Sequence, residues 1–78
     1  MPLAMLNKGE KAYIRKIVGG RTAKGKLTGL GLISGKEVTM YSENRGTGPI
    51  IVGIDSNRIA LGRGMAHKIL VEDEGSDN

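Results

Sequence analysis

The sequence predicts a small all-β protein: an antiparallel β-barrel of about five short strands, with a short helical insertion after the first strand. Three observations indicate this fold. Apolar runs of strand length recur along the chain, glycine-rich segments separate them, and one stretch alone has a helical period. We expect the sheet to close partly into a barrel, because closure protects the edges of a few strands from pairing with other chains.

The first strand is expected over residues 10–18, a β-branched run with glycines on both sides. Side chains alternate between the two faces of a strand. Ala12 and Ile14 should therefore share one face, and Tyr13, Arg15 and Ile17 the other.

A short helix is expected next, because Ala23, Leu27 and Leu30 follow one another at helical spacing and form one stripe. Gly31 is well placed to end this helix in a left-handed conformation. Two further glycines, Gly25 and Gly29, each cost a helix about 1 kcal/mol relative to alanine. The helix should therefore depend on packing more than on helix propensity.

The rest of the chain is expected to alternate strands and turns. In order, we predict a turn at residues 33–35, a strand over 38–42, a loop over 43–49, a strand over 50–54, a turn at 55–57, a strand over 58–61, one turn of 3₁₀ helix at 62–65 and a last strand over 67–71.

Size and composition limit the protein to one domain. Its 78 residues contain no cysteine, phenylalanine or tryptophan, so the core must be aliphatic and without disulfides. No apolar stretch is long enough to span a bilayer, and the start lacks the pattern of a secretory signal, so a cytoplasmic protein is expected. We divide the chain into an N-terminal extension (1–5), a domain (6–72) and a disordered acidic tail (73–78).

The charge is uneven. The net charge is +4, but residues 72–78 carry four acidic and no basic side chains, so the first 71 residues carry +8. A basic body favours an anionic partner, which could be nucleic acid, a membrane surface or an acidic protein. Five side chains, Arg15, Lys16, Arg21, Lys24 and Lys26, could form a basic face around the helix.

Residues for bond chemistry are missing. There is no cysteine nucleophile, and His67 is the single histidine, too few for a catalytic triad or a metal centre. Residues 20–27 approach a phosphate-binding loop, but Leu27 stands where that loop needs a magnesium-binding hydroxyl. We therefore expect a non-enzymatic protein with no cofactor, no metal ligands and a strand-edge His67.

The segment 26–38 (KLTGLGLISGKEV) resembles the helix end and turn of the FeoA family, ferrous-iron transport protein A, and residues 49–53, 58–66 and 69–71 resemble its later strands. The resemblance implies an SH3-like barrel and an accessory role in Fe²⁺ uptake. It also implies a partner, the cytosolic GTPase part of the FeoB permease. The chain departs from the family pattern at Ser34, where a proline is usual and the turn should be looser, and at two glycines of the helix.

The sequence is compatible with two functions. The first is docking onto the transporter through an apolar patch of Leu27, Leu30, Leu32 and Ile33, rimmed by Arg21, Lys24 and Lys26. The alternative is that Leu27 and Leu30 both close the barrel core. We expect burial in the core more for Leu30 than for Leu27. The second function is a small basic barrel that binds nucleic acid, although only two tyrosines could stack on bases. Exposed strand edges would also allow a homodimer.

Overall fold

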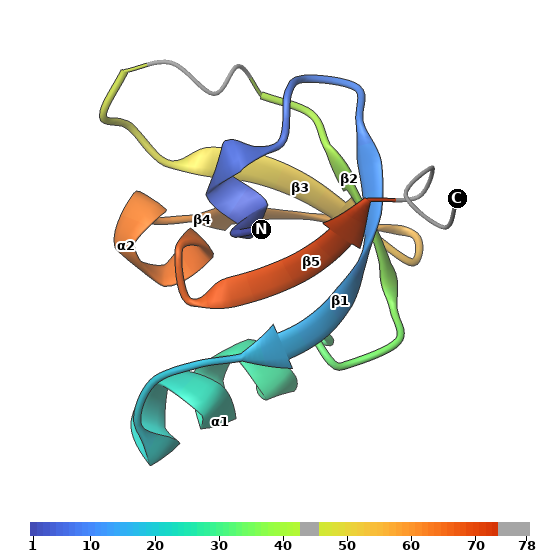
Figure 1. The fold of residues 1–78 in the computed structure, drawn as a ribbon. Helices are drawn as coiled ribbons and strands as arrows, with labels where there is room; N and C mark the ends of the chain where they lie inside the picture. The colour runs from blue at the N-terminus through green and yellow to red at the C-terminus, as the bar shows by residue number, and fades with distance from the viewer. Residues whose placement is uncertain (43–45, 74–78) are drawn as a thin grey trace.

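A computed structural model of the chain describes residues 1–42 and 46–73. Its elements are the 3₁₀ helix η1 (Leu3–Met5), strand β1 (Lys11–Ile17), helix α1 (Arg21–Gly29), strands β2 (Glu37–Met40), β3 (Ile50–Ile54) and β4 (Asn57–Leu61), helix α2 (Arg63–Ala66) and strand β5 (Ile69–Asp73), shown in Figure 1. The five strands and the helix after β1 confirm the predicted fold class.

All five strands belong to one antiparallel sheet with the order β4-β3-β2-β1-β5. The first four strands pair in chain order, and β5 returns to pair with the other side of β1. The sheet curls around one interior (Figure 1), but β4 and β5 do not pair with each other. The barrel is therefore partly closed, as the need to shelter strand edges predicts.

A β-bulge changes the alternation of side chains along β1. Ala12 and Ile14 are buried and Tyr13 and Arg15 are exposed, as predicted. The pairing register with β5 shifts just after Ile14, and from there on Ile17 packs against the core. The prediction that Ile17 shares the outer face was wrong, because a bulge inserts one extra residue and reverses the alternation beyond it.

The core is entirely aliphatic, and no polar or charged side chain is buried among the described residues. Every strand contributes to it, as do η1 and the end of α1. Its largest fully buried side chains are Leu3, Leu6, Ile14, Leu27, Leu32, Met40, Ile50, Ile69, Val38 and Val52. The composition favours such a core, because the chain has no phenylalanine or tryptophan to fill it.

The predicted N-terminal extension, residues 1–5, is part of the barrel. Leu3 and Ala4 are buried in the core, and η1 contacts both β5 and α2. Met1 and Pro2 pair with the free edge of β5, where the backbone N–H of Val71 donates to the carbonyl of Met1 at 2.7 Å. Residues that look like an extension thus cover a strand edge and fill the core.

The boundaries of the C-terminal elements also differ from the predicted ones. The segment after β4 is the α-helix α2 and not a 3₁₀ turn, and His67 is its C-cap, before the last strand begins. Glu72 and Asp73 belong to β5, where Asp73 pairs with Ala12. The predicted strand ended at Val71 and the predicted tail began at Asp73, but β1 is long enough to pair with both residues. Residues 74–78 and part of the predicted loop, 43–45, lie outside the described residues.

Candidate interaction surface

The C-terminus of α1 forms a Schellman cap. Gly31 has a φ of +91°, its N–H donates to the carbonyl of Thr28 at 2.9 Å, and the N–H of Leu32 donates to the carbonyl of Leu27 at 3.0 Å. This pair of bonds commonly brings together the two apolar side chains that flank it. Leu27 and Leu32 accordingly both enter the core.

The cap divides the predicted docking patch. Leu27 and Leu32 are buried and cannot be part of an exposed patch, which corrects the prediction for both. Leu30, the C-cap residue, is 47% exposed and Ile33 is 41% exposed. The alternative that both Leu27 and Leu30 close the core holds for Leu27 only, the opposite of our expectation.

The three basic residues of the predicted rim lie on two sides of α1. Lys26 is one turn before Leu30, so both lie on the same side of the helix. Arg21 and Lys24 line a shallow pocket of about 680 Å³ on the outer side, together with both helix glycines. We define the docking patch as the two predicted apolar residues that remain exposed, Leu30 and Ile33, together with Lys26 on the same side of α1 as Leu30.

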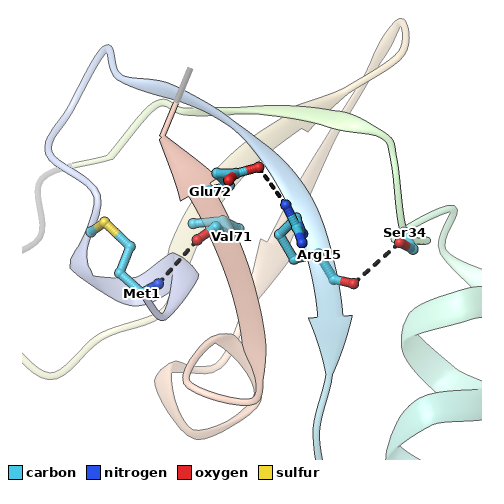
Figure 2. Close-up of polar contacts among 5 residues, drawn as sticks. All are labelled: Met1, Arg15, Ser34, Val71 and Glu72. Carbon is cyan, nitrogen blue, oxygen red and sulfur yellow. Dashed lines mark hydrogen bonds and ion pairs between the residues drawn. The ribbon is translucent and has the colours of Figure 1, made fainter. Parts of the chain in front are cut away.

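The turn after α1 is tied to β1. The hydroxyl of Ser34 donates to the carbonyl of Arg15 at 3.2 Å, and the N–H of Gly35 donates to the carbonyl of Ile14 at 2.7 Å. Figure 2 shows the Ser34 contact beside the ion pair of Arg15 and Glu72, whose atoms lie 2.6 Å apart. The serine thus bonds the turn to the bulged strand, and the looser turn stays a prediction.

Among residues 1–42 and 46–73, no three His, Asp or Glu side chains gather closely enough to hold a metal ion. His67 is exposed at the end of α2. No helix in this part of the chain combines the length and the apolar character that crossing a membrane requires.

Comparison with known proteins agrees with this description. The family model of the FeoA domain matches residues 1–73. A putative Fe(2+) transport protein A from Methanocaldococcus jannaschii is 36% identical over 72 residues, which cover 92% of this chain and 85% of that protein.

Two solved structures have the same fold. The crystal structure of an iron uptake regulatory protein, FeoA, is 32% identical with a TM-score of 0.87 and covers 92% of this chain and 95% of its own. Stenotrophomonas maltophilia FeoA in complex with zinc, an SH3 domain protein, is 25% identical with a TM-score of 0.82 and covers 92% and 89%. The small barrel is thus SH3-like, and the chain belongs to the FeoA family of non-enzymatic ferrous-iron transport proteins.

Proposed function

We propose that this protein is a cytosolic accessory of ferrous-iron uptake that docks onto the cytosolic GTPase domain of a FeoB-type permease through the docking patch. The observation that carries the proposal is the exposure of Leu30 and Ile33. Among the described residues, they are the only leucine, isoleucine or valine side chains that are exposed. The fold buries or half-buries all the others.

Two features suit this patch to a protein partner. Its aliphatic side chains stand on the short connection between α1 and β2, where the Schellman cap and the bond from Ser34 fix the backbone. A preformed patch loses little conformational entropy when it binds. The ammonium group of Lys26 beside it favours an acidic surface on the partner and would steer its approach.

The test is a calorimetric titration of the purified permease GTPase domain with the wild-type protein and single variants. Leu30→Asp and Ile33→Asp should each weaken binding by roughly tenfold or more. Binding would bury the exposed half of each aliphatic side chain, and each variant loses this contribution and places a charge in the interface instead. Lys26→Glu should weaken binding mainly through a slower association rate.

The matched control is Ala60→Asp, which places the same charge at an exposed position on β4. Leu27 is unsuitable for this test, since an aspartate in the core would unfold the domain. Wild-type affinity of Leu30→Asp and Ile33→Asp would reject the patch, as would equal weakening by Ala60→Asp.

A further inference from the structure

A second surface forms where the end of β1 meets the start of β5. Lys16 pairs with Leu70, and the N–H of Val18 donates to the carbonyl of Lys68 at 2.8 Å. Ile17 and Ile69, which pair with each other between these two positions, pack on the core. Because side chains alternate along a strand and cross-strand neighbours share a face, these four side chains lie on the outer face of the sheet.

Gly19 connects this outer face to α1. The side chain of Lys68 lies against Gly19, with its Cδ 3.3 Å from the place of a Cβ at that glycine. Gly19 also borders the shallow pocket that Arg21 and Lys24 line. We call four cations the basic end of the molecule: Lys68, Arg21 and Lys24, which lie around Gly19, and Lys16 on the outer face of β1.

Carboxylates meet the basic end at Lys16, where Glu72 and Asp73 line the same open pocket. The two stretches that build it, residues 11–36 and 56–71, contain no aspartate or glutamate. In the described part of the chain, the ion pairs are formed by Arg15 and Lys36. None of the four cations of the basic end takes part in one. The acidic residues of β5 lie at the far end of that strand, beside Tyr13 and Ala12. The charge therefore changes sign along the β1–β5 pair, with Lys16 at the boundary.

Aliphatic side chains accompany the cations. Val18 and Leu70 are half-buried, and Met1 is exposed beside Lys16 and Leu70 in an open pocket of about 660 Å³, whose other side is lined by Glu72 and Asp73. Neither tyrosine belongs to this surface. Tyr13 stands opposite two glutamates, Glu37 and Glu72, and the Tyr41 ring is covered by an arginine of β4.

We propose that the basic end binds the surface of an anionic membrane. Clustered lysines are attracted to the negative potential of anionic headgroups, and aliphatic groups beside them can enter the headgroup region. Single-stranded nucleic acid suits this surface less, because binding there depends on aromatic side chains that stack on bases. The contact would hold the protein beside a membrane transporter and uses a different surface from the docking patch.

The experiment is co-sedimentation of the full chain with vesicles of phosphatidylcholine alone and with vesicles that contain one third phosphatidylglycerol. Binding is expected to the anionic vesicles only, and it should fall as salt is raised. The double variant Lys16→Gln/Lys68→Gln should weaken binding by about 30-fold, from about fivefold for each charge.

The matched control is Lys8→Gln/Lys11→Gln, which removes the same charge from exposed lysines at the other end of β1. It should bind almost as wild type does. Equal loss in both double variants would show an effect of net charge alone and overturn the proposal, as would no sedimentation with anionic vesicles at low salt. Circular dichroism checks that every variant is folded.

A second readout locates the contact. The chain has no cysteine, so Thr28→Cys beside the basic end and Ala60→Cys on β4 can each carry one polarity-sensitive fluorophore. Anionic vesicles should shift the emission of the first label to shorter wavelength and leave the second unchanged. If labelled single-stranded RNA or DNA binds more tightly than the vesicles, with the same loss in Lys16→Gln/Lys68→Gln, the basic end is a nucleic-acid surface and the proposal is wrong.

Discussion

Tyr41 and Gly53 form a local arrangement on the outer face of the sheet. The tyrosine ring occupies the space in which a Cβ at Gly53 would lie. Arg58, the cross-strand neighbour of Gly53, places its guanidinium carbon 4.2 Å from the ring centroid. The glycine is therefore needed for the space that it leaves, and the ring covers a strand position that has no side chain of its own.

Gly53→Ala should lower the free energy of unfolding by about 1 kcal/mol, because the ring must leave and its contact with the guanidinium is lost. In a Tyr41→Ala background the same change should raise it by about 0.5 kcal/mol, since glycine in a strand is less favourable than alanine. Urea unfolding of the four proteins gives the coupling. An identical effect of Gly53→Ala in both backgrounds would contradict the arrangement.

At the scale of single elements, α1 is held to the barrel by few side chains. Leu27 is its one buried residue, and its first turn has neither a side-chain cap nor an acidic residue. Gly25 lies in the interior of the helix, with nothing within 4 Å of an added Cβ. The helix could therefore be made more stable without a change in its packing. Its present stability comes mainly from the burial of Leu27 and Leu32 on the two sides of the cap.

Gly25→Ala should raise the free energy of unfolding by about 0.5–1 kcal/mol, because alanine favours the helix and meets no neighbour. Gly31→Ala, the same chemical change six residues later, should lower it by about 1 kcal/mol or more, because its backbone is left-handed. Thermal melts of both variants test the contrast. A stabilised Gly31→Ala would show that the cap relaxes to another backbone conformation.

For the molecule as a whole, stability depends on a thin aliphatic core to which the first residues contribute. Leu3 is fully buried, and the residues before it cover the edge of β5. A domain of this size has little core to spare. Substitution of a buried N-terminal residue should therefore destabilise the domain as much as substitution of a buried residue in a central strand.

Leu3→Ala should lower the free energy of unfolding by about 2–5 kcal/mol, the usual range for a cavity in a core. Leu30→Ala removes the same atoms from an exposed side chain and should change it by no more than about 0.5 kcal/mol. Guanidinium unfolding measures both. Similar losses in the two variants would mean that residues 1–5 do not pack as the structure shows.

Much of the fold was predictable because local signals agreed with it. Ile50–Ile54 is an apolar run of strand length, and Gly31 carries the conformation that ends α1. The Schellman rule, applied to that glycine, could also have paired Leu27 with Leu32 from the spacing of the residues alone. Which apolar side chains near the helix end stay exposed was predicted less well, because the stripe of the helix was continued past its cap to Leu30.

By itself, the sequence determined that the core is aliphatic and without disulfides, because the absence of phenylalanine, tryptophan and cysteine does not depend on folding. The tertiary structure alone decided three features. It brought Leu3 and Ala4 into the core, extended β5 to Asp73, and placed Lys68 beside Gly19 to complete the basic end. Each of these depends on a contact between residues far apart in the chain, and local composition carries no information about such pairings.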